Sequence, residues 1–165
     1  MPIVVFMRHG DALHPPHGLK TESFLRVTNL TEVVAVSLRG TPRVHSAKEH
    51  EAEETARVVA KTLNATHFTH RAISEDNGGE DIAIFVRLII GDATSAIIVT
   101  HGVVIGRLIK EIARQAGKKL IFTDKGSRGR ILVLWPQLLW LRPRAIIIDT
   151  ETMEAKIVST KDHTR

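Results

Sequence analysis

The chain has 165 residues, 43% of them hydrophobic and 25% charged, which is typical of one globular domain spanning residues 1–165 with its own core. The absence of cysteine excludes disulfide bonds and thiolate chemistry. No apolar run approaches the roughly 18 residues of a membrane span, and no basic leader precedes the first apolar run. We therefore expect a cytoplasmic protein with no membrane partner, and its net charge of +5 favours anionic ligands.

The first predicted element is a buried strand over residues 3–7 that ends on Arg8-His9-Gly10. Its apolar residues do not alternate with polar ones, which is typical of a parallel strand covered on both faces. Ligands of such sheets bind at the carboxyl ends of the strands. A guanidinium and an imidazole at that end indicate a site for an anion, and phosphate is the natural candidate.

The next stretch predicts three further elements. A loop rich in proline and glycine covers residues 10–18, and we expect a short helix over residues 19–30. Residues 32–37 predict the second core strand. Thr41-Pro42 is typical of a helix start, a hydroxyl N-cap followed by proline, and a helical pattern then continues to residue 63.

A second strand ends like the first one. Residues 94–100 predict a buried strand that runs into His101-Gly102, and a helix follows over residues 103–115 until Gly117 stops it. Because the carboxyl ends of parallel strands lie at one edge of a sheet, we expect His9 and His101 to lie together. The other predicted elements are an edge strand within residues 65–73, an acidic loop over 74–81, a helix over 82–90, strands over 131–135, 144–149 and 155–159, and a frayed tail over 161–165.

These motifs together resemble the histidine phosphatase superfamily, also called the phosphoglycerate-mutase-like family. Arg8-His9-Gly10 is similar to the family's Arg-His-Gly signature, and residues 97–102 resemble its second catalytic histidine motif. Residues 54–60 resemble the helix that follows the family's Ser-Pro-x-x-Arg element. The short length is most similar to the SixA-type phosphohistidine phosphatases. The resemblance implies an α/β fold, a three-layer sandwich with a mostly parallel central sheet and helices on both faces.

The resemblance also implies a mechanism. His9 attacks phosphorus in line and forms a covalent phosphohistidine. Arg8, a second arginine, His101 and Gly102 surround the phosphoryl oxygens, and Glu75 is the best candidate for the acid that protonates the leaving group. The reaction needs no metal and no cofactor. The expected substrate is a phosphohistidine protein or a small phosphomonoester, rather than a nucleic acid.

The second arginine has no clear position in this sequence. If Thr41-Pro42 matches Ser-Pro, the arginine position falls on His45. Counting back from the Thr-Ala pair of the helix gives Glu51, whose carboxylate cannot replace an arginine. If Ser37 takes the place of the serine, two arginines are nearby.

Of those two arginines we favour Arg43, followed by Arg39, because they flank the start of the predicted helix, where free N–H groups bind anions. The degenerate motif leaves a second hypothesis open, a catalytically impaired relative that binds phosphorylated or nucleic-acid partners. Its binding surface would be the basic region of residues 107–130, although for this region we favour the simpler interpretation of a solvated helix face and loop. The basic residues there are Arg107, Lys110, Arg114, Lys118, Lys119, Lys125, Arg128 and Arg130, against Glu111 and Asp124.

Overall fold

The computed structural model describes residues 4–36, 38, 40–77, 80–91, 94–115, 121–122, 131–134, 144–148 and 154–159. Its helices are α1 (Thr21–Ala35), α2 (His50–Leu63), the 3₁₀ turn η1 (Arg71–Ile73), α3 (Glu80–Gly91) and α4 (Gly102–Gln115). Its strands are β1 (Val4–Arg8), β2 (Arg43–Ser46), β3 (His67–Thr69), β4 (Ala96–Thr100), β5 (Ile121–Phe122), β6 (Ile131–Leu134), β7 (Arg144–Ile148) and β8 (Glu154–Ser159).

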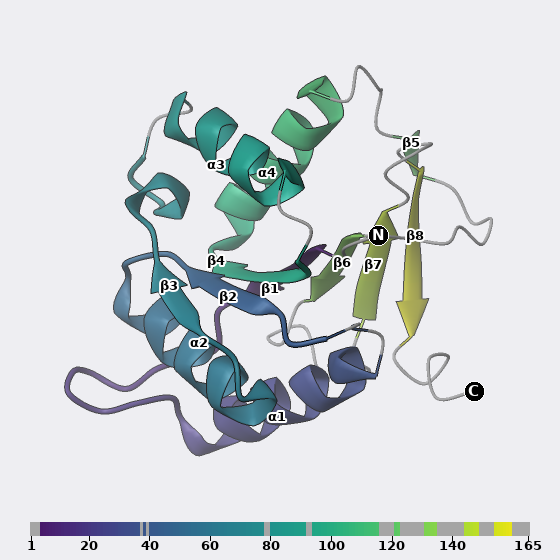
Figure 1. Cartoon of the computed structure of the whole chain (residues 1–165). Helices are drawn as coiled ribbons and strands as arrows, with labels where there is room; N and C mark the ends of the chain where they lie inside the picture. The colour runs from purple at the N-terminus through teal and green to yellow at the C-terminus, as the bar shows by residue number, and fades with distance from the viewer. Residues whose placement is uncertain are drawn as a thin grey trace.

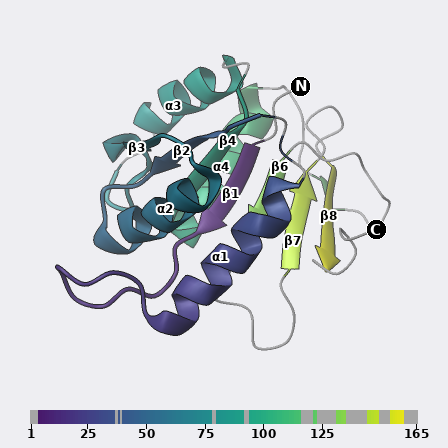
Figure 2. The ribbon, with the colours of Figure 1, turned by 60° about the horizontal axis from the view of Figure 1, so that its bottom comes forward.

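In the described part of the chain these strands form one sheet with the order β3-β2-β4-β1-β6-β7-β8-β5. The pairs from β3 through β6 are parallel, and so is β5 with β8, whereas β7 runs antiparallel to both of its neighbours. Helices α1 and α2 cover one face of the sheet, and α3 and α4 cover the other (Figures 1 and 2). The predicted three-layer α/β sandwich with a mostly parallel sheet is therefore confirmed. No helix among the described residues combines the length and the apolar character that crossing a bilayer requires.

The central strands β1 and β4 are apolar without alternation because both of their faces are covered. Val5, Phe6 and Met7 are fully buried, and so are Ile97 and Val99. The two strands pair in parallel with Arg8 opposite Thr100. This register brings the next residues, His9 and His101, to the same edge of the sheet, at the carboxyl ends of the two strands, as the sequence predicted.

Two predictions for the region before residue 50 are wrong. Residues 32–35, predicted as a strand, form the last turn of α1. The β-branched run lies in a helix because a stripe at helical spacing faces the core, and this packing outweighs the weak helix propensity of valine and threonine. The buried residues of that stripe are Ser23, Val27, Leu30, Thr31 and Val34.

The helix predicted from residue 42 begins only at His50, after strand β2. Val44, His45 and Ser46 are buried in this strand, between β4 and β3, where a fully paired backbone stabilises them more than one turn of helix would. Strand β3 lies at the edge of the sheet, as predicted. The predictions for Gly117 and for the tail lie outside the described residues.

Candidate active site

His9 directly follows β1, at the carboxyl edge of the sheet. Its backbone N–H donates to the Thr100 carbonyl, 3.1 Å away, which continues the β1–β4 ladder by one bond. The ring atom Nδ1 lies 2.9 Å from the carbonyl oxygen of Gly10. Because a carbonyl only accepts hydrogen bonds, Nδ1 carries the proton. The neutral ring therefore keeps the lone pair on Nε2, which is the form of imidazole that attacks an electrophile.

The turn at Gly10 is held between two helices. The Gly10 N–H donates to Thr55 Oγ1 at 2.9 Å, and the Thr55 hydroxyl donates in turn to the Glu51 carbonyl in α2 at 2.7 Å. A Cβ on residue 10 would lie 3.2 Å from the Ser23 Cβ in α1, so glycine allows this close approach. The backbone that carries His9 is thus fixed from both sides.

His101 meets His9 from the neighbouring strand. The two ring centroids are 4.6 Å apart and the ring planes are inclined by 63°. The His101 carbonyl accepts the N–H groups of Val104 and Ile105, both at 3.0 Å, so this residue directly precedes and caps α4. Gly102 is the first residue of that helix. The amino end of α4, with its positive helix dipole, therefore lies beside the two imidazoles.

Arg8 ends β1 immediately before His9. Its Nε atom is buried and has no hydrogen-bond partner among the described residues. A buried guanidinium nitrogen without a partner is costly, and an oxyanion would satisfy it. The positions of Arg8 and of the α4 amino end favour negative charge at this edge of the sheet.

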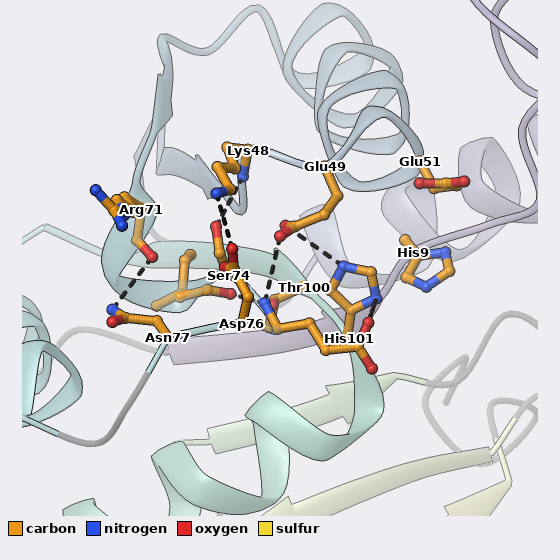
Figure 3. A network of polar contacts seen from close by, with 12 residues as sticks. His9, Lys48, Glu49, Glu51, Arg71, Ser74, Asp76, Asn77, Thr100 and His101 are labelled. Atoms are coloured by element: carbon orange, nitrogen blue, oxygen red, sulfur yellow. Dashed lines mark hydrogen bonds and ion pairs between the residues drawn. The ribbon is translucent and has the colours of Figure 1, made fainter.

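Carboxyl groups from other elements also reach the site, and Figure 3 shows Glu49 and Glu51 beside the two histidines. Glu49, just before α2, places Oε2 at 3.4 Å from His101 Nε2, and Glu75 places Oε2 at 3.7 Å from His101 Nδ1. The backbone N–H of Glu75 donates to Glu49 Oε1 at 3.3 Å. Glu51, in the first turn of α2, acts on the charge of His9. Both imidazoles therefore have carboxylate neighbours.

Burial determines the protonation of His9. It lowers the pKa of the imidazole below its ordinary value of 6.5, because the charged form loses hydration. The hydrogen bond to Gly10 and the carboxylate of Glu51 act in the opposite direction, whereas His101 and Arg8 lower the pKa further. The net shift is downward, so His9 is neutral at neutral pH.

The structure brings together most of the residues that the sequence singled out, but not the second arginine. Arg43 pairs with Ala96 at the amino end of β4, whereas the histidines follow Thr100 at its carboxyl end. With about 3.3 Å per strand residue, this places Arg43 at the amino ends of the parallel strands, on the opposite side of the sheet from the two histidines. Arg39 lies outside the described residues.

From the sequence, Glu49 was not expected in the site. Glu51 was considered only because it occupies one position where the second arginine was sought. The one available signal for Glu51 was its spacing, one helical turn before Thr55, which places both side chains on the side of α2 that faces Gly10. For Glu49 there was no signal, because the predicted helix began too early. In the described part of the chain, no three histidine or carboxylate side chains are grouped closely enough to hold a metal ion.

No protein-family model matches this chain, and neither does any curated protein sequence. Solved structures, in contrast, are similar over nearly its whole length. The protein histidine phosphatase SixA in complex with tungstate has a TM-score of 0.59 and 15% identity, over 96% of this chain and 97% of SixA. A structure from Nakamurella multipartitia assigned as a SixA phosphohistidine phosphatase has a TM-score of 0.58 and 16% identity, over 95% and 93% of the two chains.

The fold is also shared with an enzyme named for a different reaction. The phosphoglycerate mutase from Plasmodium falciparum has a TM-score of 0.53 and 15% identity, over 96% of this chain and 89% of the mutase. The chain thus has the fold of the histidine phosphatases and phosphoglycerate mutases, and its architecture is similar to that of SixA. At these identities the comparison shows the fold, and the chemistry depends on the residues of the site.

Proposed function

We propose that this chain is a phosphatase that hydrolyses a phosphohistidine or a small phosphomonoester through a covalent phosphohistidine on His9. The observation that carries the proposal is the orientation of the His9 ring. Its Nδ1–H donates to the Gly10 carbonyl, which leaves the lone pair on Nε2 of a neutral ring that contacts His101 and whose charge Arg8 disfavours. The fold shared with SixA supports the same reaction class.

In the first step His9 Nε2 forms a bond to phosphorus while the bond from phosphorus to the leaving group breaks. Arg8 and the α4 amino end, including Gly102, would stabilise the negative charge of the transferred phosphoryl group. Glu75, beside His101, would protonate the leaving group. Water then attacks the phosphohistidine, which releases inorganic phosphate and restores His9. No step requires a metal ion.

Phosphoenzyme trapping tests this function directly. The protein is mixed with a ³²P-labelled phosphodonor, denatured, and analysed for label that is lost in acid and retained in base, as phosphohistidine is. We expect label in the wild type and in the control His14→Ala, which alters an exposed loop histidine. His9→Ala should carry none. Absence of label and of turnover with phosphoesters and phosphoramidates alike would contradict the proposal.

One observation favours the second candidate, a catalytically impaired binding protein. Carboxylates adjoin the two histidines of the site, and Arg43 lies far from it. Of the basic region over residues 107–130, the side chains of Arg107, Lys110 and Arg114 are described, and Arg114 is paired with Glu111 at 2.7 Å. Steeply salt-dependent binding of nucleic acid without any turnover would favour this candidate.

A further inference from the structure

The site has an unusual balance of charge for one that receives a phosphoryl group. Two carboxylates, those of Glu49 and Glu51, adjoin the two imidazoles beside the carboxyl group of Glu75, and Arg8 is the described arginine that acts on His9. In Figure 3, Glu49 lies over the His101 ring and Glu51 over the His9 ring. Negative charge thus lies next to both rings, along the side of the site that α2 covers.

The neighbouring cations are engaged elsewhere. Lys48 is paired with Asp76 at 3.1 Å, and Arg57 is paired with Glu53 and Glu54 on the outer side of α2. Arg107 donates to the Asn77 carbonyl at 3.3 Å. These groups have partners of their own, so within the described residues they do not neutralise the carboxylates of Glu49 and Glu51 at the histidines.

The carboxylates are also held in place and partly shielded from water. Glu49 has a side chain that is 23% exposed, and its Oε2 is buried, makes no hydrogen bond and lies 3.4 Å from His101 Nε2. Glu51 is fixed on α2 by the same turn that bonds to Thr55 and, through it, to Gly10. A buried carboxylate oxygen without a donor is costly. A ligand with a cationic N–H group next to its phosphoryl group would supply that donor.

Resting on the proposed function, we infer that the substrate is a phosphoramidate of a strongly basic nitrogen, such as an N-phosphorylated guanidine or amine, whose positive charge Glu51 and Glu49 bind. The substrate itself brings the positive charge that pairs with these two carboxylates. A phosphomonoester without a cationic group would place its dianion beside these carboxylates, with Arg8 and the amino end of α4 as the described positive charges that balance it. Glu51 is then a specificity-determining residue.

The chemistry balances on the residues present. The lone pair of His9 Nε2 forms the new nitrogen–phosphorus bond, and the electron pair of the breaking bond stays on the departing nitrogen. That nitrogen takes a proton from the carboxyl group of Glu75 and leaves as a guanidinium or ammonium ion. Glu51 and Glu49 bind this positive charge in the substrate and again in the departing product, which positions the breaking bond against His9 Nε2.

The test compares kcat/KM for N-phosphoarginine, phosphohistidine and p-nitrophenyl phosphate. We expect the wild type to prefer N-phosphoarginine over the aryl ester by at least about tenfold. Glu51→Gln should lower kcat/KM for N-phosphoarginine by about tenfold and leave the aryl ester equal or faster. Glu51→Arg should reverse the preference. The matched control Glu53→Gln lies on the same helix, where Glu53 pairs with Arg57, and should leave the ratio unchanged.

The outcomes separate this inference from the function on which it rests. Turnover of all three compounds without a preference for N-phosphoarginine overturns the inference and leaves the phosphatase intact. So does a Glu51→Gln variant that slows all three equally. If none of the three compounds is hydrolysed and His9 is never labelled, the proposed function fails and the inference fails with it. Circular dichroism of each variant verifies that it is folded, and the wild-type ratio decides the question without any variant.

Discussion

The imidazole rings of His9 and His101 meet edge to face with their centroids 4.6 Å apart. Backbone geometry brings the two residues together. Strands β1 and β4 are parallel neighbours with Arg8 opposite Thr100, and the His9 N–H continues their ladder to the Thr100 carbonyl. The next residue of each segment therefore emerges at the same place, although the two segments are far apart in the sequence.

The pH dependence of catalysis follows from the burial of His9. Because its pKa is lowered from 6.5, and the nucleophile must be neutral, the acid limb of kcat/KM should lie below about pH 6.5. Glu51 raises the pKa of His9, so Glu51→Gln should move this limb to still lower pH. Initial rates across a pH series measure the shift, and Glu53→Gln is the control. An acid limb that stays in place or moves to higher pH in Glu51→Gln would show that Glu51 does not raise the pKa of His9.

The hydroxyl of Thr55 joins the catalytic turn to α2. Replacing it in Thr55→Val leaves the buried Gly10 N–H without an acceptor, which should cost about 1–3 kcal/mol of unfolding free energy. Thr62→Val is the matched control on the same helix, because Thr62 makes the same type of bond, to the Val58 carbonyl, on an exposed surface. It should change stability by less than about 0.5 kcal/mol. Urea denaturation of both variants makes the comparison, and equal losses would be inconsistent with the link.

Two glycines offer a second matched comparison. A Cβ at position 10 would lie 3.2 Å from the Ser23 Cβ, whereas one at position 106, in α4, would meet nothing within 4 Å. Gly10→Ala should therefore destabilise the protein by about 1–3 kcal/mol through overpacking. Gly106→Ala should stabilise it by about 0.5–1 kcal/mol, because alanine is the better helix former. Thermal denaturation of the two variants tests both signs, and a stable Gly10→Ala would mean that α1 can move away.

Stability should also fall in mild acid. Burial lowers the pKa of His67 and His70, as well as that of His9, so the unfolded chain binds protons more readily than the folded one. The contribution of these histidines is fully present above about pH 6.5 and is lost as the pH falls through their lower folded values. The urea midpoint should therefore be lower at about pH 5 than at about pH 7.5. A double variant, His67→Gln with His70→Gln, should show a smaller difference between the urea midpoints at the two pH values. If the double variant shows the same difference as the wild type, these two histidines do not cause the loss of stability in acid.

By itself, the sequence determined the parts of the protein that depend on local pattern. The unbroken apolar runs of β1 and β4, each ending on histidine and glycine, predicted two buried parallel strands and a shared edge for His9 and His101. These predictions succeed because a strand that is buried on both faces requires consecutive apolar residues, which can be recognised in the sequence. The three-layer architecture follows from the same pattern with its intervening helices.

Only the tertiary structure decided the rest. The extent of α1, the start of α2 and the placement of Arg43 at the far edge depend on which apolar stripe packs against the sheet and on the direction of β2. Glu49 and Glu51 join the site because α2 begins there, beside the carboxyl ends of β1 and β4. Such contacts join residues distant in the chain, and the packing energies that select them have no local signature in the sequence.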